Sequence, residues 1–206
     1  MPLTVDEGRS AVGLARETLE AHVRGVPAPA EGPDAGALSE RRGVFVTLST
    51  WLGGRTALRG CIGYPEPIKP LGLAIRDVAV YASEDPRFPS PVSADELDRI
   101  VVEVSVLTVP QDLAVSARRD LPSKVRVGTD GLIVSDHHAS GLFLPQVATE
   151  QGWRSETFLA EACAKAGLPM DAWLAEGTRV RVFQADIFAE TSPRGKIERV
   201  ERATQR

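Results

Sequence analysis

Residues 43–63 decide the fold class, and they read GVFVTLSTWLGGRTALRGCIG. From Gly43 to Thr50 an apolar side chain alternates with a mixed set, the pattern of a strand with one apolar face. Gly53-Gly54 is a turn signal and Arg55 to Gly63 returns as a second strand, so a β-hairpin is predicted. The strands of a hairpin pair antiparallel, which favours an antiparallel sheet.

Helices are predicted to interrupt these strands. Thr4 and Glu7 have capping-box spacing at the start of a first helix, which Gly25 ends. A second helix is predicted from Leu71 to Ser83, and Ile100 to Thr108 is the clearest single strand. Because hairpins and helices do not follow strict β-α-β alternation, the residues predict an α+β fold rather than a doubly wound parallel sheet.

The second half of the chain is predicted as a series of short elements. A helical stretch near Leu113 to Asp120 precedes a hairpin within Lys124 to Val134 that turns at Thr129-Asp130-Gly131. A helix that Ser155 caps then follows, and Thr178 to Ala189 forms a closing strand.

Length and composition indicate one large domain or two small, closely packed ones. The chain has 206 residues, of which 43% are hydrophobic, enough for a core without disulfides or metals. We interpret residues 1–190 as a single domain and residues 191–206, mostly charged and polar, as a loose or weakly helical C-terminal tail.

Charge and motifs limit the classes of partner. The net charge is −4, so nucleic acid is a disfavoured partner, and no apolar run is long enough to span a bilayer. The N-terminal residues carry Asp6, Glu7 and Glu17 and do not resemble a targeting segment, so a cytoplasmic location is expected, with both cysteines reduced. No zinc-type cluster, phosphate-binding loop or dinucleotide fingerprint is present, so no cofactor or metal is predicted.

The segment Leu58 to Gly63 carries the first candidate site. In a regular strand Arg59, Cys61 and Gly63 share one face, and Leu58, Gly60 and Ile62 share the other, with Leu58 and Ile62 as core residues. A guanidinium beside a thiol favours the reactive thiolate form, whereas a cysteine in a sheet is also commonly a small buried hydrophobe. Both interpretations of Cys61 stay open.

Other candidate residues surround this segment. Gly60 and Gly63 leave room for a ligand or another chain segment to approach the backbone. The polar face of the strand from Ile100 offers Glu103 and Ser105, the rigid loop after Ser83 offers Asp85 and Arg87, and Gln146 lies near a helix start. The structural alternative is an Arg59–Glu103 or Arg87–Asp85 ion pair that ties strands and loop together.

The hexapeptide Leu-Arg-Gly-Cys-Ile-Gly at 58–63 resembles the signature of the AMMECR-one domain family. Further blocks that resemble the family follow in its order: Gly43–Leu48, Glu84–Phe88, Glu103–Leu107, Gly128–Gly131, Gly141–Val147, Gly152-Trp153, Phe158-Leu159, Lys165–Leu168 and Trp173. The resemblance implies two packed α/β subdomains, each with a mainly antiparallel sheet and flanking helices. It places the hexapeptide near the cleft between them, and it implies no established reaction.

The short length is similar to prokaryotic members of that family, called protein A of the AmmeMemoRadiSam system. The resemblance therefore implies a Memo-like protein and a radical S-adenosylmethionine enzyme as partners. The first function considered is an enzyme or enzyme component in such a modification pathway, with Cys61, Arg59 and Glu103 as catalytic residues. The second is an adaptor that binds a partner, a peptide or a small molecule. The third is an RNA-associated protein, which the net negative charge disfavours.

Overall fold

The computed structural model describes residues 2–28 and 36–200, and these divide into two compact units. The first unit comprises the chain up to Thr108 together with Asp186–Val200. The second unit comprises Val109–Ala185. Each unit has its own sheet and its own cluster of buried hydrophobic side chains.

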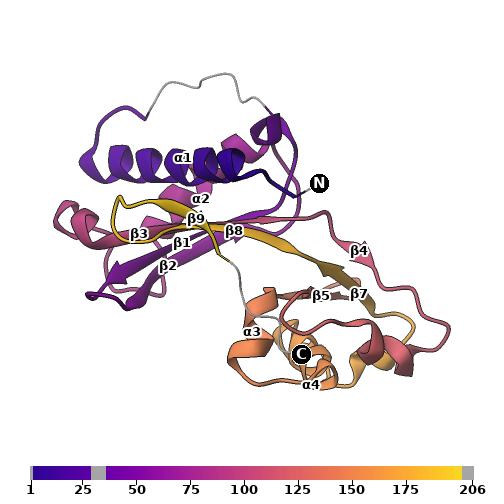
Figure 1. Ribbon diagram of the computed structural model, residues 1–206. Helices are drawn as coiled ribbons and strands as arrows, with labels where there is room; N and C mark the ends of the chain where they lie inside the picture. Colours follow the sequence, from indigo (N-terminus) through magenta and orange to yellow (C-terminus); the bar gives the residue numbers. More distant parts are fainter. Residues whose placement is uncertain (1, 29–35, 201–206) are drawn as a thin grey trace. The chain divides into compact units, whose positions relative to one another are not determined.

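The first unit is built on a five-stranded sheet in the order β2-β1-β3-β8-β9 (Figure 1). The strands are β1 (Val44–Trp51), β2 (Thr56–Tyr64), β3 (Ile100–Leu107), β8 (Ala185–Glu190) and β9 (Ile197–Arg199). β1 pairs antiparallel with both β2 and β3, so the predicted hairpin over 43–63 is confirmed. β2 lies at an edge of the sheet.

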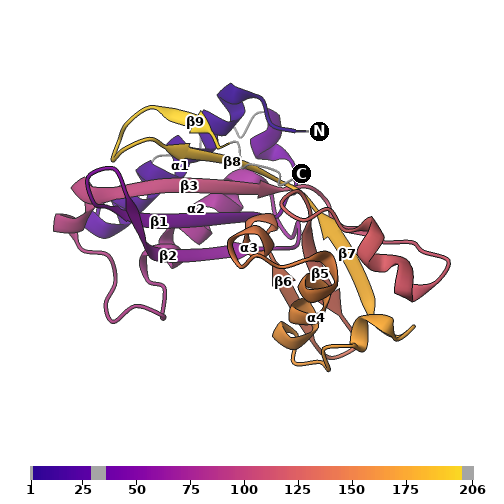
Figure 2. The same ribbon diagram turned by 60° about the horizontal axis from the view of Figure 1, so that its bottom comes forward.

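Two helices cover one face of this sheet, α1 (Val5–Arg24) and α2 (Leu71–Ser83). α1 begins with the predicted capping box of Thr4 and Glu7 and ends at Gly25, whose φ of 65° is left-handed. The shorter 3₁₀ helices Gly36–Ser39 and Ala94–Arg99 complete the unit. Figure 2 shows the opposite face of the sheet, which no helix of this unit's described residues crosses; we call it the helix-free face.

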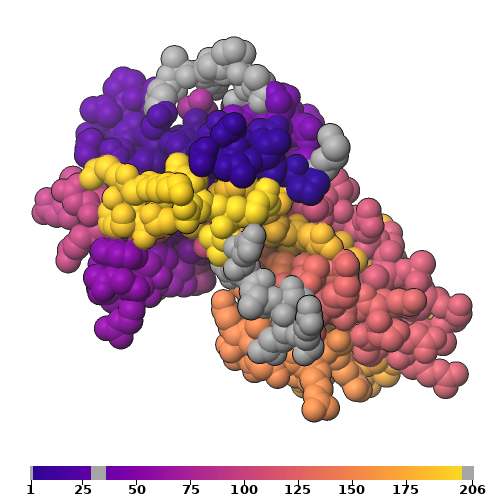
Figure 3. Space-filling view, viewed as in Figure 1, coloured from indigo at the N-terminus to yellow at the C-terminus, as the bar shows by residue number. Residues whose placement is uncertain are grey.

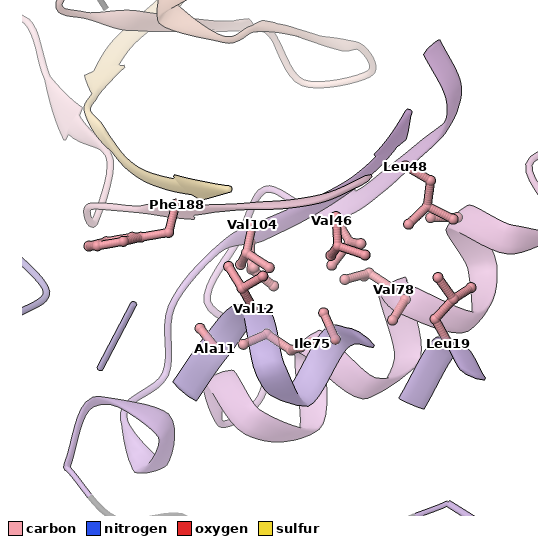
Figure 4. Packing of buried hydrophobic residues seen from close by; sticks show 14 of the residues in the cluster. Ala11, Val12, Leu19, Val46, Leu48, Ile75, Val78, Val104 and Phe188 are labelled. Carbon is pink, nitrogen blue, oxygen red and sulfur yellow. The ribbon is translucent and has the colours of Figure 1, made fainter. Parts of the chain in front are cut away.

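The core of the first unit lies between the sheet and the two helices (Figure 4). Alternate residues of β1 and β3 point into it because strand side chains alternate between faces. The labelled side chains that meet there are Ala11, Val12 and Leu19 of α1, Ile75 and Val78 of α2, and Val46, Leu48, Val104 and Phe188 of the sheet. The same alternation places Phe45 and Thr47 of β1, and Glu103 and Ser105 of β3, on the helix-free face.

The closing strand predicted from Thr178 to Ala189 is two strands in two different sheets. β7 (Arg179–Phe183) belongs to the second unit, and β8 belongs to the first. The prediction of a loose tail after residue 190 is wrong for Ile197–Arg199, which form β9 against β8 and lie beside α1 (Figure 3). Arg199 explains this: its guanidinium pairs with Asp186 and lies 4.6 Å from the centre of the Phe188 ring.

The second unit is a four-stranded sheet in the order β4-β7-β5-β6. β4 is Gln111–Asp112, β5 is Gly131–Ser135 and β6 is Ser140–Phe143, and all the pairings are antiparallel. Two α-helices, α3 (Pro145–Glu150) and α4 (Ser155–Lys165), and the 3₁₀ helices Arg118–Lys124 and Ala172–Leu174 belong to this unit. Phe158, Leu159, Cys163 and Trp173 are buried in its core.

Three local predictions in the second unit are wrong. The hairpin turns between Ser135 and Ser140 rather than at residues 129–131, because the Asp130 carboxylate accepts the Arg126 amide and closes a separate turn before β5. The helical stretch expected near Leu113–Asp120 lies instead at Arg118–Lys124. Ser155 does not cap α4, since its hydroxyl donates to the Val125 carbonyl.

Among the described residues, no helix combines the length and the apolar character needed to cross a membrane.

Candidate functional site

Three side chains form a row across the helix-free face of the first unit. Thr47 of β1 lies opposite Cys61 of β2 on one side and opposite Glu103 of β3 on the other. Directly opposed residues of antiparallel strands have Cβ atoms about 5 Å apart on the same face. The Thr47 hydroxyl donates to the Cys61 sulfur over 3.2 Å, and the cysteine is half-buried. We call these three residues the Cys61 row.

The main chain of Cys61 is held from outside the sheet. β2 is an edge strand, and the Cys61 N–H donates to Asp85 Oδ2 over 2.9 Å, while Arg87 Nη2 donates to the Cys61 carbonyl over 2.9 Å. Asp85 and Arg87 also form an ion pair with each other, as one of the two structural alternatives predicted. The Asp85 side chain is fully buried, whereas the Arg87 side chain is 57% exposed. We call Asp85 and Arg87 the clamp.

Arg59 points to the loop rather than to the thiol. Its guanidinium pairs with Glu96 over 2.7 Å and donates to the Ser90 carbonyl over 3.0 Å, and it lies 5.5 Å from the centre of the Phe88 ring. The Arg59–Glu103 ion pair considered from the sequence is therefore replaced by Arg59–Glu96. One guanidinium nitrogen, Nη1, is buried without a hydrogen-bond partner.

A β-bulge accounts for this difference. The register between β1 and β2 shifts at Leu48/Ser49, where Gly60 pairs with Leu48 and Leu58 pairs with Ser49, so Arg59 is the extra residue. Simple alternation fails across a bulge. Leu58, which alternation assigns to the core, is 50% exposed, while Ile62 beyond the bulge packs against the core as predicted.

The electrostatics of the site leave the thiol protonated. Burial raises the pKa of the Cys61 thiol, and this outweighs the hydrogen bond from Thr47 and the charge of Arg87, which both lower it. Glu103 and Asp85 also raise the pKa of the thiol. The expectation that a neighbouring Arg59 favours the thiolate is therefore wrong: the cation that acts on the thiol is Arg87.

The carboxyl groups of Asp85 and Glu96 are charged, whereas the thiol is neutral. The side-chain hydrogen bond from Arg87 holds the pKa of the Asp85 carboxyl far below its usual range. The hydrogen bond from Arg59 likewise lowers the pKa of Glu96. Both carboxylates are therefore ionised at neutral pH and serve as fixed acceptors, which makes Asp85 a poor general base.

The two glycines of the hexapeptide are needed for close packing of other chain segments. A Cβ atom on Gly60 would lie 2.0 Å from the Ala82 carbonyl oxygen and 3.5 Å from Asp85 Cβ. A Cβ atom on Gly63 would lie 2.4 Å from the Phe45 ring. The sequence left open whether a ligand or another chain segment uses this space. At both glycines, another segment of the chain occupies it.

The family model described as AMMECR1 matches residues 12–188. The chain belongs to the AMMECR1 family. A curated protein from Methanothermobacter thermautotrophicus is 53% identical over 193 residues, covering 92% of this chain and 97% of that one. Protein MJ0810 of Methanocaldococcus jannaschii is 46% identical over 197 residues, covering 95% and 96%. The predicted resemblance to this family is thus confirmed.

The crystal structure of PH0010 from Pyrococcus horikoshii, described as an uncharacterized protein, has the same AMMECR1 fold. It matches with a TM-score of 0.87 and 46% identity, covering 96% of this chain and 98% of that chain. The α+β prediction with antiparallel sheets is confirmed. The site residues described above all lie within the AMMECR1 match.

The remaining predicted site residues of this AMMECR1 chain are Ser105, in the first unit, and Gln146, in the second. Ser105 is buried on β3, in register with Phe45 and two residues along the strand from Glu103. Gln146 is the second residue of α3 in the second unit, and its Oε1 atom is buried without a hydrogen-bond partner. In the part of the chain that the structure describes, no three metal-ligating side chains are grouped to hold a metal ion.

Three contributors to the site were missed from the sequence. Thr47 is opposite Cys61, and the hairpin register could have found it. Glu96 completes a capping box with Ser93 and also pairs with Arg59, and the sequence did not indicate this second contact. Phe88 carried no signal for its contact with Arg59, because that contact depends on how the loop wraps around β2.

Proposed function

We propose that this AMMECR1-family protein is an enzyme or enzyme component in which Cys61 bonds covalently to a substrate on the helix-free face of the first unit. One observation carries the proposal: the half-buried sulfur lies in line with a hydroxyl and a carboxylate, while its backbone is held by two further side chains. Nucleophile, acid or base and supporting groups converge in this way in cysteine-dependent enzymes.

The roles follow from the chemistry of each group. The Cys61 sulfur supplies the electron pair for a bond to an electrophilic carbon, and the electrons displaced from that carbon move to its neighbouring heteroatom. The thiol proton passes to the carboxylate of Glu103, which lies two strands away across Thr47. The Thr47 hydroxyl donates to the sulfur and stabilises its anionic form. Arg59 holds the loop rather than the sulfur.

The raised pKa of the thiol means that the proposed reaction needs a base. A protonated resting thiol reacts only when a base removes its proton, so the reaction depends on Glu103 and on exclusion of water by the substrate. The setting that we propose is a modification pathway with a Memo-like protein and a radical S-adenosylmethionine enzyme; its support is the family resemblance alone, and co-purification of the three proteins tests it.

The covalent role is tested with a panel of small electrophiles, such as an aldehyde, a thioester and an activated alkene. We expect adducts at Cys61 by peptide mass spectrometry and none at the buried Cys163. Glu103→Gln removes a charge that raises the thiol pKa, so it should lower that pKa and yet slow adduct formation, while Glu150→Gln, a carboxylate change in the second unit, should change neither. Reaction of Cys61 at the rate of a free thiol of equal pKa, unaffected by Glu103→Gln, would overturn the proposal.

A second function, a non-catalytic adaptor, is favoured by one specific observation. Burial keeps the thiol neutral, and Arg59 and Arg87 are both engaged in ion pairs, which fits a rigid recognition surface as well as a reaction centre. The adaptor does not need the Cys61 sulfur, whereas the covalent role does. An adaptor should bind its partner with Cys61→Ala as tightly as with the native residue, whereas a covalent role is abolished by that change.

A further inference from the structure

We infer that Asp85 and Arg87 are positioning residues for Cys61: the clamp fixes the main chain of the cysteine from outside the sheet and so fixes where its sulfur points. The inference deepens the proposed function, on which it rests for what the positioned thiol does. The positioning itself is a separate physical statement and is tested separately.

The hydrogen-bond pattern of the hairpin shows why Cys61 needs outside support. In an antiparallel pair, opposed residues alternate between those that exchange main-chain hydrogen bonds and those that do not. Because the Cys61 N–H and carbonyl are bonded to the clamp, the Thr47–Cys61 pair is of the second kind. Both main-chain groups of Cys61 therefore point away from β1, at the open edge of the sheet.

Two features would otherwise leave this residue loosely held. An edge strand exposes its unpaired main-chain groups to water, and the bulge at Leu58 and Arg59 interrupts the ladder just before Cys61. Gly63 serves as an internal comparison. It has the same relation to Phe45 as Cys61 has to Thr47, so its main-chain groups also point outward, and among the described residues no side chain bonds to them.

The contacts of the clamp exceed what its own loop requires. A similar pair in the second unit, Asp130 and Arg126, also combines a buried carboxylate with an exposed guanidinium, at 2% and 64% side-chain exposure. Asp130 accepts the Arg126 N–H and pairs with its guanidinium, which closes a local turn. It also accepts a 3.4 Å contact from Gln184 Nε2, but among the described residues it makes no hydrogen bond to the main chain of a distant strand, as the clamp does. Asp85 and Arg87 make the same local contacts and in addition each donates or accepts one hydrogen bond at Cys61.

The neighbouring glycine supports the same interpretation. The end of α2 and Asp85 approach β2 so closely that residue 60 has no space for a Cβ atom, since the Ala82 carbonyl oxygen would lie only 2.0 Å away. The motif thus combines the reactive side chain at 61 with a missing side chain at 60 that admits the clamp. Arginine suits position 87 because its fork of N–H groups reaches the carboxylate and the Cys61 carbonyl together.

The test is amide hydrogen exchange measured residue by residue by NMR, in the full chain. In the native protein, Cys61 should be protected and Gly63 should exchange much faster. Arg87→Lys keeps the charge but loses the fork, and Asp85→Asn removes the charge. Each should lower the protection of the Cys61 amide by about tenfold or more, the change expected when a hydrogen bond to a charged group is lost. The Ile62 amide, bonded into β1, should keep its protection.

The matched controls are Arg126→Lys and Asp130→Asn, which alter the similar pair in the second unit and should leave Cys61 protection unchanged. A second measurement is the limiting alkylation rate of fully ionised Cys61, which reports the placement of the sulfur once it is corrected for the thiol pKa measured in the same titration. Arg87→Lys should change that rate, while Arg126→Lys should not. If Asp85→Asn fails to fold, Arg87→Lys carries the test.

The inference is overturned if Cys61 exchanges as fast as Gly63 in the native protein. It is also overturned if the clamp variants leave Cys61 protection and its limiting rate unchanged, or if the control variants lower them equally. Failure of the proposed function looks different. Cys61 would then show clamp-dependent protection but react with every electrophile as a free thiol does.

Discussion

Gly60→Ala places a methyl group where the Ala82 carbonyl oxygen already lies. The new Cβ atom would be 2.0 Å from that oxygen and 3.1 Å from the carbonyl carbon, and both are backbone atoms that cannot rotate away. An ordinary contact is about 3.4 Å, so the end of α2 must move by more than about 1 Å relative to β2. Because Asp85 follows directly after this helix end, the clamp moves with it.

The expected cost follows from two opposing effects. Overpacking in a close-packed region typically costs about 1–3 kcal/mol, and a backbone contact belongs at the upper end of that range. The reduced freedom of the unfolded chain returns about 0.4–1 kcal/mol. We therefore expect Gly60→Ala to lower the free energy of unfolding of the first unit by about 2 kcal/mol.

Gly13→Ala is the matched control for this change. Gly13 lies inside α1, and a Cβ atom there would meet no atom within 4 Å. Alanine is the better helix former, so this variant should gain about 0.5–1 kcal/mol. Hydrogen exchange of β1 and β2 peptides in increasing urea reads the first unit alone. An unchanged midpoint for Gly60→Ala, or a loss of stability for Gly13→Ala, would refute the packing argument.

Three further predictions concern the thiol and a buried ion pair. Because burial raises the pKa of Cys61, its alkylation should reach half the limiting rate at a higher pH than that of a free cysteine. The stability that the neutral thiol contributes should be lost as the pH rises through the folded-state pKa. An alkylation midpoint at or below the pH found for a free cysteine would contradict this. Thr47→Val removes a hydrogen bond that lowers the pKa, so the same titration should move further upward, and a downward shift would contradict the role given to Thr47. Glu190→Ala leaves the buried Arg16 guanidinium without its main partner and the Val102 N–H without its acceptor, so it should lower the free energy of unfolding by about 3–5 kcal/mol. Thermal unfolding measures this loss, at roughly 2–4 °C of melting temperature per kcal/mol. A melting temperature within about 2 °C of the native value would contradict the prediction.

The sequence was informative wherever structure depends on neighbouring residues. The helix Leu71–Ser83 and the capping box at Thr4 are as predicted, because caps and helical periodicity are local properties. The hairpin over 43–63 is likewise as predicted, since its turn and alternation are contained in one stretch.

The features that the sequence did not predict depend on contacts between distant residues. The bulge that redirects Arg59 exists only relative to the register with β1. Arg87 becomes the cation near the thiol because its loop returns along the edge of β2. The strand Ile197–Arg199 is too polar to be recognised alone and is formed by pairing with β8.

The candidate site is partly predictable for the same reason. Cys61, Glu103, Asp85 and Arg87 belong to the first unit, and the structure brings them together there. Which cation faces the thiol, and whether the thiol is ionised, depend on burial and on loop placement, and spacing along the chain encodes neither. The role of each residue in a reaction stays a prediction.

The most direct test of the covalent role compares Cys61 in the folded and the urea-unfolded protein. The measurement is the rate constant of its fully ionised thiolate toward iodoacetamide and toward a carbonyl electrophile, obtained from the full pH dependence of adduct formation. If the fold positions this sulfur for reaction, the folded thiolate should react faster than the unfolded one with at least one of the two electrophiles, by more than its higher pKa alone accounts for. Equal or slower reaction of the folded thiolate with both would contradict the account and leave Cys61 as a packing residue.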